Sequence, residues 1–336
     1  MSETISVSIV TFNHERWLSA CLESVLNQSA RVRVTVFDNG STDASRQIAE
    51  RFPVRLTVSE QNLGFCAAHN RNIRADDSPY ILILNPDVVL DPCFIETLLG
   101  ALKQVPGAGM AGGKLLRFTA DGALATRDGR PILDSTGIYF TPAQRHFDRG
   151  SETPDRGQFD KRQLVFGITG AAVLCSREML EDVRVGDDFF DEDFFAYRED
   201  ADLSWRAQLY GWKAVYEPQA TALHRRAVLP SNRRAVSDLV NFHSVKNRYL
   251  LRIKNMDSAV RRRCFPYMWL RDAGIVMYAL LRERSSLAAF KEVRRLRPRF
   301  EKKRELIQSR RRVAPQDIAR WFAFSPVSYD LTGGGY

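Results

Sequence analysis

The chain has 336 residues, of which 44% are hydrophobic and 26% are charged, with 20 glycines and 14 prolines. This composition supplies enough apolar volume for a core and excludes a disordered, collagen-like or low-complexity chain. The five cysteines are scattered without paired spacing, which argues against a disulfide framework or a zinc knuckle and favours a reducing cytosol. The length predicts one large domain and a smaller addition, which we place at residues 1–235 and 236–336. The N-terminus lacks a basic leader with an apolar core, so we expect no signal peptide.

The net charge of +9 is distributed unevenly along the chain. Residues 246–312 contain 21 Lys and Arg against 6 Asp and Glu, a net charge of +15, whereas the remaining residues carry a net charge of −6. We therefore expect the basic segment to meet an anionic neighbour. Its most apolar stretch, residues 265–281, is interrupted by Arg271 and Asp272, so we do not expect it to span a bilayer.

Short β-branched runs alternate with helical periodicity over residues 1–115, which predicts an α/β sheet with crossover helices. The predicted strands are 5–11, 32–36, 54–58 and 80–84, and the predicted helices are 17–26, one capped at 41–43 and running to 51, and a short one from Gly64. Each strand ends in polar residues. Because the carboxyl ends of strands form the ligand crevice of an open α/β sheet, we expect the site there.

The second half of the chain has a different character. Residues 117–162 are rich in Gly, Asp, Arg and Pro with weak periodicity, which predicts a long excursion or mobile loop that flanks the site. Strand material follows at 165–175, and then a short helix capped by Ser176, a helix at 199–210 and a strand at 213–217. From about 235 to 320 the pattern predicts basic helices.

Two carboxylates follow predicted strands directly. Asp38 beside Gly40 could accept hydrogen bonds from a nucleobase or a ribose hydroxyl, or it could be a turn residue that caps the next helix. Asp87 follows Pro86 and is suited to a hard divalent cation that bridges phosphates, although a turn aspartate is the alternative.

A third acidic group lies among aromatic residues at 189–206. An apolar wall raises the pKa of a carboxyl group and suits it to general base catalysis, whereas Glu199, Asp200 and Asp202 could also be caps in the first turn of a helix. The capping explanation suits Asp202 better than Asp200. His224 could be a metal ligand or a buried neutral histidine. Cys66 and His69 have no second pair and are interpreted as structural.

Six sequence blocks occur in order along the chain. They are SIVTFN (8–13), DNGSTD (38–43), NLGF (62–65), LNPD (84–87), TGA (169–171) and FFAYREDADLSWR (194–206), the last followed by ALH (222–224). With these blocks the chain from residue 5 to about 230 resembles the family 2 glycosyltransferases of GT-A fold, most closely their bacterial rhamnosyltransferase-like branch. The resemblance implies a Rossmann-like mixed α/β sheet flanked by helices, here with a basic helical C-terminal extension.

The resemblance also implies roles for individual residues. Thr11 and Asp38 would hold the base and ribose of a nucleotide sugar, and Asp200 matches the family's catalytic base. Asp87 and His224 would bind Mg²⁺ or Mn²⁺ together with the donor diphosphate. The full set implied to bind the nucleotide sugar is Thr11, Asn13, Asp38, Asn62, Gly64, Asn85, Gly170 and Ala171.

The sequence departs from the family pattern at several of these positions. Asn85 replaces the first Asp of the Asp-x-Asp metal motif, so a neutral side chain would meet the ribose or a water. Ala44 and His69 stand where the branch usually has Gly and Asn. Arg225 and Arg226 replace the small residues usual after His224, which puts the local acceptor contacts in doubt.

The function implied is inverting transfer of a sugar, L-rhamnose from dTDP-rhamnose or else a hexose from a UDP-sugar, to a saccharide acceptor. We expect a lipid-linked acceptor, a role in cell-surface polysaccharide synthesis, and a cytoplasmic enzyme peripheral at the inner face of the membrane. The basic tail would lie on an anionic membrane surface through apolar residues interleaved with arginines. Its helices could instead pack on the catalytic domain or on a second subunit in a homodimer.

Two other classes of function remain open from the sequence. A metal-dependent nucleotidyltransferase would share the crevice and the cation but would release pyrophosphate. A non-catalytic nucleic-acid-binding protein would explain the +15 segment. We expect no nucleic acid partner, because the basic run lacks an RNA-recognition motif and the rest of the chain is acidic.

Overall fold

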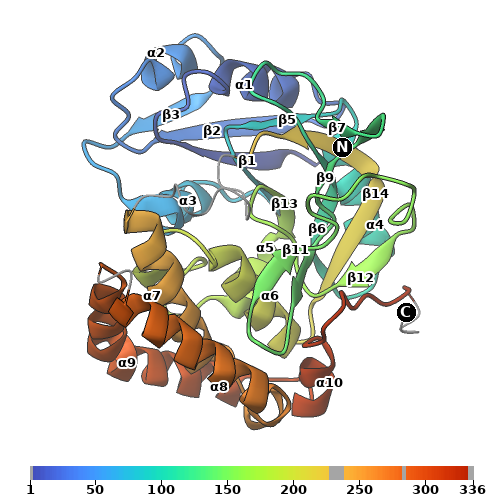
Figure 1. The fold of residues 1–336 in the computed structure, drawn as a ribbon. Helices are drawn as coiled ribbons and strands as arrows, with labels where there is room; N and C mark the ends of the chain where they lie inside the picture. The colour runs from blue at the N-terminus through green and yellow to red at the C-terminus, as the bar shows by residue number, and fades with distance from the viewer. Residues whose placement is uncertain (1–2, 227–237, 282–284, 332–336) are drawn as a thin grey trace.

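The chain folds around a central mixed sheet (Figure 1), and the computed structural model describes residues 3–226, 238–281 and 285–331. The strands are β1 (Ile5–Thr11), β2 (Val32–Asp38), β3 (Arg55–Val58), β4 (Tyr80–Leu84), β5 (Val88–Leu90), β6 (Ala108–Arg117), β7 (Thr126–Arg127), β8 (Arg130–Pro131), β9 (Leu133–Ser135), β10 (Ile138–Phe140), β11 (His146–Asp148), β12 (Gln163–Val165), β13 (Ala172–Ser176) and β14 (Lys213–His224). The helices are α1 (Leu18–Leu26), α2 (Ser45–Ala49), α3 (Gly64–Arg74), α4 (Phe94–Gln104), α5 (Arg177–Val183), α6 (Glu199–Leu209), α7 (Asp238–Asn255), α8 (Ser258–Leu281), α9 (Ser285–Ser309) and α10 (Pro315–Arg320), with a 3-10 turn η1 at Glu192–Phe194.

The sheet has the strand order β12-β14-β6-β13-β4-β1-β2-β3 within the described residues, with β5 paired to β14 and β9 to β6. Strands β1 to β4 run parallel, so their carboxyl ends share one edge, where Thr11 lies opposite Asp38. The other half is mixed, because β13 runs antiparallel to both β4 and β6. The predicted α/β class is confirmed. The strand predicted at 213–217 is longer than expected and runs on to His224.

One helix begins later than the sequence predicted. The start predicted at 41–43 is wrong, because α2 begins at Ser45. The carboxylate of Asp43 instead accepts hydrogen bonds from the backbone N–H groups of Glu15 and Ser45, at 3.0 and 2.9 Å. Asp43 therefore joins the loop after β1 to the loop after β2 rather than capping a helix that begins there.

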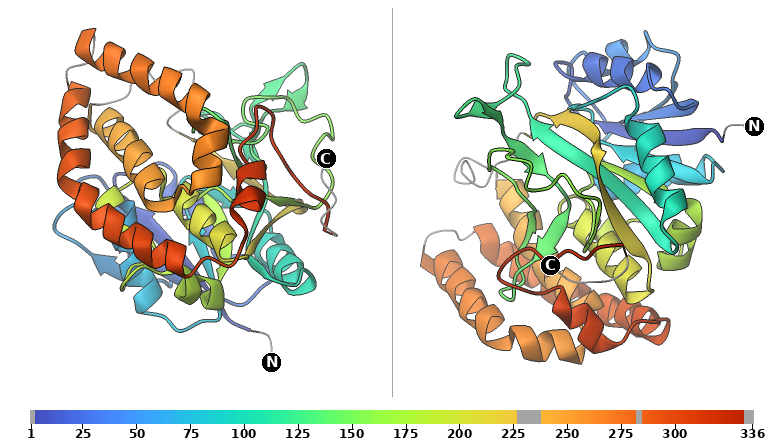
Figure 2. Two further views of the ribbon diagram at one scale, coloured as in Figure 1. Left: turned by 90° about the horizontal axis from the view of Figure 1, so that it is seen from below. Right: turned by 90° about the vertical axis from the view of Figure 1, so that its right-hand side faces the viewer.

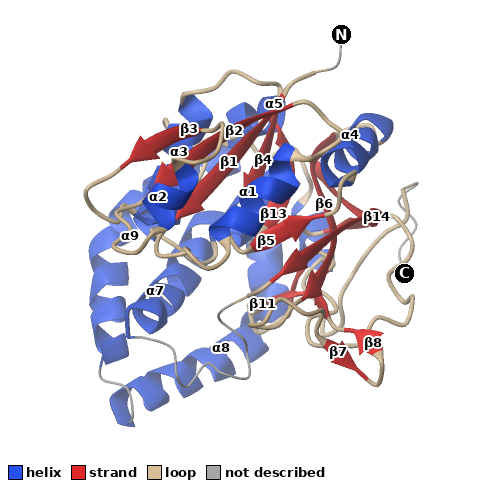
Figure 3. Ribbon diagram, turned by 90° about the horizontal axis from the view of Figure 1, so that it is seen from above, coloured by secondary structure: helices blue, strands red, loops and turns tan. Residues whose placement is uncertain are grey.

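The apolar residues of the central strands alternate between two cores, one on each face of the sheet. Ile81 and Ile83 of β4 enter the core that contains residues of α3, α5 and α6, whereas Leu82 and Leu84 enter the core that contains residues of α1 and α4. Figure 3 shows the helices on both sides of the strands. Such alternation is expected for a wholly apolar strand that is covered on both faces.

Residues 117–162 form short strands and buried turns, so the long excursion predicted here has a folded structure of its own. β9 extends the sheet beside β6, and β10 pairs with β11. Buried polar side chains of the segment form hydrogen bonds: Arg149, which is 2% exposed, donates from Nη1 to Gln163 Oε1 at 2.7 Å and from Nε to the carbonyl oxygen of Thr136 at 3.1 Å. Hydrogen bonds of this kind help a segment with weak apolar periodicity to adopt a defined structure.

The helices after residue 238 lie against the rest of the molecule (Figure 2). α7 packs on both α9 and α6, and α10 packs on α8. Leu250, Phe300 and Phe322 belong to the same core as Ile81 of the sheet. The predicted helical character of this region is confirmed, and its apolar side chains complete the core on one face of the sheet.

Cations of the basic segment pair with acidic residues near η1 and α6. Lys254 is fully buried and donates to Asp191 Oδ2 at 2.7 Å and to Asp202 Oδ2 at 2.8 Å. Lys303 reaches Asp191 Oδ1 at 2.5 Å and Asp193 Oδ2 at 2.7 Å. The protein itself therefore supplies part of the anionic neighbour that the basic segment requires.

Two expectations about the C-terminal region concern its independence and its relation to a bilayer. The division into domains at 1–235 and 236–336 stays a prediction. One hydrophobic core contains residues from both sides of that boundary. None of the helices in the described ranges is both long and apolar enough to cross a membrane.

We predict that Lys254→Met destabilises the protein by about 3–5 kcal/mol, because it removes one cation from each of two buried carboxylates and leaves Asp191 with Lys303 and Asp202 with Arg206. Urea unfolding followed by tryptophan fluorescence measures this change. The control is Lys302→Met on an exposed position of α9, which should alter the free energy of unfolding by no more than about 0.5 kcal/mol. Equal stabilities for the two variants would contradict a structural role for the buried ion pairs.

Candidate functional site

A cavity of about 640 Å³ lies at the carboxyl ends of β1, β2 and β4. Val10, Phe12 and Asn39 line it from the first two strand ends, and residues 85–87 line it from the loop after β4. The opposite walls come from residues 145–151, 195–200 and α7. The site is therefore at the predicted edge of the sheet, and the 117–162 segment flanks it as expected.

Most of the residues predicted for the site line this one cavity. They are Asn62, Gly64, Asn85, Asp87, Gly170, Ala171, Asp200 and His224. The structure thus brings together segments that are far apart in the sequence, from the end of β4, the start of β13, the end of β14, the start of α3 and the start of α6.

Thr11, Asn13 and Asp38 are not among the lining residues. Thr11 is fully buried and Asp38 is 1% exposed, at the paired ends of β1 and β2. Asn13 is exposed, and its Oδ1 accepts a hydrogen bond from the backbone N–H of Thr42 at 2.8 Å. Their assignment to the base and ribose of a nucleotide stays a prediction.

Asn39 ties the strand ends to the start of α3. Its Nδ2 donates to Asn62 Oδ1 at 2.9 Å, and its Oδ1 accepts from the backbone N–H of Leu63 at 2.8 Å. Gly64 follows with φ +84°, and a Cβ there would lie 2.6 Å from the Phe195 ring. Only glycine allows this left-handed conformation and this close approach of the two cavity walls.

Asp87 and His224 lie side by side in the lining of the cavity. Asp87 Oδ1 lies 3.5 Å from His224 Nε2, and His224 Nδ1 lies 2.7 Å from Oδ2 of the fully buried Asp134. Burial opposes a charge on His224, but the carboxylates of Asp134 and Asp87 outweigh it and raise the pKa of the imidazole to about 9. The same imidazole contributes to holding the pKa of both carboxyl groups below their ordinary value, against the effect of burial.

This donor set is suited to a divalent cation. A histidine whose second ring nitrogen binds a buried carboxylate is the usual arrangement at metal sites, because the carboxylate fixes the ring orientation. Within the described residues no group of three or more His, Cys, Asp or Glu side chains forms a metal cluster. Asp87 and His224 would thus supply two ligands, and the oxygens of a bound diphosphate and water would complete the coordination shell of Mg²⁺ or Mn²⁺.

Arg226 extends the charge network toward the other side of the cavity. Its Nε lies 3.3 Å from Asp134 Oδ1, and its Nη2 donates to Asp148 Oδ2. The backbone of Arg226 is left-handed, with φ +42°, and this conformation turns the chain out of β14. The arginine that departs from the family pattern therefore occupies the site and pairs with two carboxylates from the 117–162 segment.

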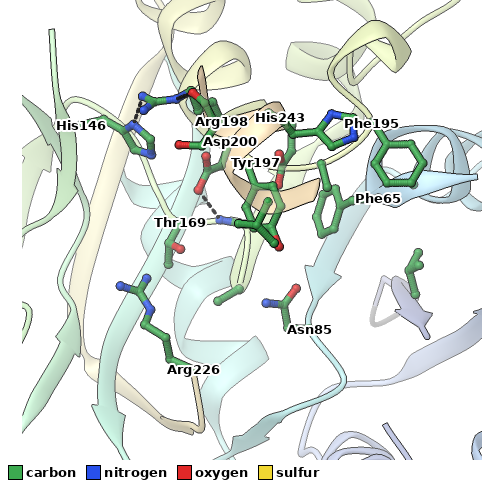
Figure 4. A pocket seen from close by; sticks show the side chains of 18 of the residues that line it. Phe65, Asn85, His146, Thr169, Phe195, Tyr197, Arg198, Asp200, Arg226 and His243 are labelled. Carbon is green, nitrogen blue, oxygen red and sulfur yellow. Dashed lines mark hydrogen bonds between the residues drawn. The ribbon is translucent and has the colours of Figure 1, made fainter. Parts of the chain in front are cut away.

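Asp200 lies in the first turn of α6 and points into the cavity (Figure 4). Its Oδ2 accepts from the backbone N–H of Gly170 at 3.2 Å, and its Oδ1 accepts from the N–H of Ala201 at 2.7 Å. Burial and the charge of Asp148 raise the pKa of Asp200, and these hydrogen bonds and Arg226 oppose the increase. The pKa of the neighbouring Glu199 is also raised, to about 8, by burial and by the adjacent Asp200.

The loop before Asp200 has an unusual backbone. Phe195, Tyr197 and Arg198 have φ values of 67°, 71° and 72°. Asn247 of α7 holds the loop, because its Nδ2 donates to three carbonyl oxygens of residues 194–197 at distances up to 2.9 Å. Left-handed residues other than glycine cost energy and persist where surrounding contacts fix them, often at functional sites.

The alternatives left open for nearby residues are resolved by their contacts. Asp202 is fully buried and binds Lys254, so it is structural, and the preference for Asp200 as the cavity carboxylate is supported. His69 is also fully buried, with Nδ1 2.8 Å from Ser8 Oγ, and burial lowers its pKa to about 3. Cys66 is fully buried as well. Neither His69 nor Cys66 lines the cavity.

Comparison with known proteins identifies the family. The sequence model described as Glycosyl transferase family 2 matches residues 6–184, which is more than half of the chain. The chain belongs to this family. The glycosyltransferase is 31% identical, over 306 residues, to the N-acetylglucosaminyl-diphospho-decaprenol L-rhamnosyltransferase of Mycobacterium tuberculosis, a match that covers 85% of this chain and 95% of that protein. It is 27% identical over 233 residues to the rhamnosyltransferase WbbL of Escherichia coli K12, covering 66% and 83% of the two chains.

Solved structures confirm the fold. GalNAc-T7 with UDP, GalNAc and Mn²⁺ superposes with a TM-score of 0.57 at 13% identity, over 76% of this glycosyltransferase and 49% of that chain. Residues 1–349 of Staphylococcus aureus TarS superpose with a TM-score of 0.52 at 14% identity, over 95% and 90% of the two chains. The expected GT-A fold is confirmed.

Several residues that line the cavity or support its walls were not found from the sequence of this glycosyltransferase. Asp134 and Asp148 lie in the segment that was interpreted as a loop, and nothing in its periodicity marks them. His146 and Arg198, whose Nδ1 and Nη1 lie 2.8 Å apart, come from segments 52 residues apart. Asn247 belongs to the basic helices, for which the sequence left a membrane surface and packing on the protein as alternatives and predicted no contact with the site.

Proposed function

We propose that this glycosyltransferase is an inverting enzyme that transfers L-rhamnose from dTDP-rhamnose to a saccharide carried on a lipid diphosphate in cell-surface polysaccharide synthesis. The observation that carries the proposal is the placement of Asp200 in the same cavity as the Asp87–His224 pair. The names of the two rhamnosyltransferase relatives favour rhamnose as the transferred sugar, and a UDP-sugar is the alternative donor. The name of the mycobacterial relative favours an acceptor linked through a diphosphate to a polyprenol.

In the proposed reaction Asp200 is the general base. An acceptor hydroxyl attacks the anomeric carbon as the bond from that carbon to the nucleoside diphosphate breaks, and the hydroxyl proton passes to the Asp200 carboxylate. The hydrogen bonds from Gly170 and Ala201 hold this carboxylate in place. A partly dehydrated carboxylate with a raised pKa accepts a proton more readily than one in water.

Asp87 and His224 would hold Mg²⁺ or Mn²⁺ beside the donor diphosphate, with Asn85 toward the ribose. The cation, when bound, would neutralise the charge of the leaving diphosphate. Asp134 would keep the imidazole of His224 oriented toward Asp87. Membership of this family favours sugar transfer over nucleotidyl transfer, and the products distinguish them, since nucleotidyl transfer releases pyrophosphate and sugar transfer releases nucleoside diphosphate.

We predict that Asp200→Asn lowers turnover about 10²–10⁴-fold while donor affinity is retained, because the amide fills nearly the same volume but cannot accept the proton. The assay follows release of nucleoside diphosphate from a panel of nucleotide sugars with a saccharide diphosphate lipid as the acceptor, and calorimetry measures donor binding. Asp187→Asn is the matched control, since that side chain is 95% exposed. Turnover above a tenth of the wild-type value would contradict the assignment of Asp200.

We predict that Asp87→Ala abolishes the dependence of donor affinity on Mg²⁺ or Mn²⁺, since the cation links this carboxylate to the diphosphate. His224→Ala should weaken that dependence more mildly. Donor binding is titrated with each cation and with EDTA, and Asp77→Ala, at a fully exposed carboxylate, is the control. Undiminished donor affinity and turnover in excess EDTA would overturn the metal assignment for both residues.

We also propose that α8 lies on an anionic membrane surface. Phe265, Trp269, Leu270, Met277 and Leu281 are between 57% and 73% exposed on this helix. The exposed residues Arg261, Arg262 and Arg263 precede this apolar surface. Of the anchor residues expected from the sequence, Met268 faces inward at 8% exposure and Ile275 is half-buried, while Val276 and Tyr278 are exposed. Apolar side chains flanked by arginines favour the headgroup region, and the competing occupant is a second copy of the chain.

We predict that the double variant Trp269→Gln, Leu270→Gln loses sedimentation with anionic vesicles, because it removes apolar area from the exposed face of α8. The control is Val58→Gln, at an exposed valine on β3, which Figure 1 places at the opposite end of the molecule from α8. Wild-type binding should decrease as salt increases. If the wild-type chain does not sediment with the vesicles, or if the double variant instead converts a dimer to a monomer, the membrane assignment is wrong.

A further inference from the structure

Positive side chains gather on the wall of the cavity that is remote from the strand ends. Arg145 follows β10, Arg248 is on α7, and Arg271 is on α8, and all three line the cavity. The Asp87–His224 pair lines the same cavity from the sheet. The cavity therefore has two regions that could bind an anion, one at the strand ends and one formed by the C-terminal helices.

Arg248 and the neighbouring Arg252 share one carboxylate. Asp272 of α8 accepts two hydrogen bonds from Arg252, at 2.9 and 2.7 Å. The same carboxylate is 3.6 Å from Arg248 Nε, which is too long for a hydrogen bond. The carboxylate of Asp272 thus lies close to both Arg252 and Arg248. Arg271 adds a further positive charge near Arg248.

Arg248 is the most constrained member of this cluster. Its side chain is 3% exposed and donates from Nη2 to the carbonyl oxygen of Ala143 at 2.6 Å. Among the described residues no hydrogen-bond acceptor meets its Nε. Burial and the charges of Arg271 and Arg252 lower the pKa of Arg248 to about 9. An anion that enters the cavity would stabilise the buried, positively charged guanidinium of Arg248, because ion pairing offsets the cost of its dehydration.

The position of Asp200 decides which anion this is. In Figure 4 Asp200 lies between Asn85 and Arg226 on one side and His146, Arg198 and His243 of α7 on the other. In the proposed function the donor diphosphate occupies the side of the strand ends. The acceptor must then approach Asp200 from the side of α7, and an anion attached to the acceptor sugar would meet the arginines there.

We infer that Arg248 and Arg271 bind the diphosphate of a prenyl-diphosphate-linked acceptor. This inference rests on the proposed function and adds a second diphosphate subsite to it. Arginine suits this role because its planar group can donate two parallel hydrogen bonds to phosphate oxygens. α8 would then contribute both to the acceptor subsite and to membrane binding. Arg271 lines the cavity, and Trp269 and Leu270 would be exposed to the lipid.

The test uses the full chain and two variants, Arg271→Gln at a half-buried position and Arg248→Gln at the buried one. Each should raise the KM for a prenyl-diphosphate-linked saccharide about 10- to 100-fold and leave the KM for the nucleotide sugar unchanged. Arg297→Gln is the control, at an arginine on α9 whose side chain is 65% exposed. Circular dichroism and thermal melting verify that each variant is folded. If Arg248→Gln does not fold, the result for Arg271→Gln decides the outcome.

Binding of farnesyl diphosphate provides a readout that does not depend on catalysis. We expect calorimetry to detect binding to the wild-type protein, weaker binding of farnesyl monophosphate, and about 10-fold or greater loss of farnesyl diphosphate affinity in Arg271→Gln. Binding of inorganic pyrophosphate that is lost in the same variant would also support the subsite, and would assign recognition to the diphosphate rather than to the prenyl chain.

Two results would overturn the inference. One is a variant that weakens the nucleotide sugar as much as the acceptor, which would place the arginines in the donor site. The other is unchanged affinity for farnesyl diphosphate in both variants, with Asp200-dependent release of nucleoside diphosphate intact. In either case the proposed function would stand. It fails separately if no nucleotide sugar yields a glycosylated product.

Discussion

The pairing of Lys254 with Asp191 and Asp202 is the interaction on which the rest of the structure depends. It joins α7 to η1 and α6 in a fully buried position, where an unpaired charge would be costly. α6 carries Asp200 in its first turn, so the position of the cavity carboxylate depends on a lysine 54 residues later in the chain. The basic C-terminal helices are therefore part of the framework that builds the site.

A second buried charge organises the other side of the cavity. Asp134 binds His224 with one oxygen and Arg117 and Arg226 with the other. This single carboxylate fixes both the imidazole that faces Asp87 and the guanidinium that pairs with Asp148. In the proposed site, Asp134 therefore stabilises both His224, on the metal-binding side, and Arg226, which lies near the proposed base. A substitution of Asp134 would alter the positions of both side chains.

The sequence predicts the sheet and the strand-end residues well because their signals are local. The apolar run at 80–84 and the polar residues at 85–87 are adjacent in sequence, so the strand, its end and Asp87 can be inferred together. Pairings across long sequence separations leave no such pattern. Asp134 lies in a Gly-rich and Asp-rich segment, and its burial follows only from the cations that surround it. The sequence left open whether the basic C-terminal region lies on a membrane or packs on the protein, because composition does not reveal that Lys254 and Arg248 are buried.

Asn247 of α7 holds the left-handed loop at 194–198, so the walls of the cavity come from different parts of the chain. The strand ends and the loop at 194–198 lie in or beside the sequence blocks that resemble the family, whereas α7, which restrains the loop, lies outside those blocks. Within the proposed function, donor choice and acceptor choice are therefore encoded in separate stretches of the chain. On that proposal, an enzyme of this architecture would change its acceptor through α7, α8 and residues 143–148 while its donor half and Asp200 stay the same.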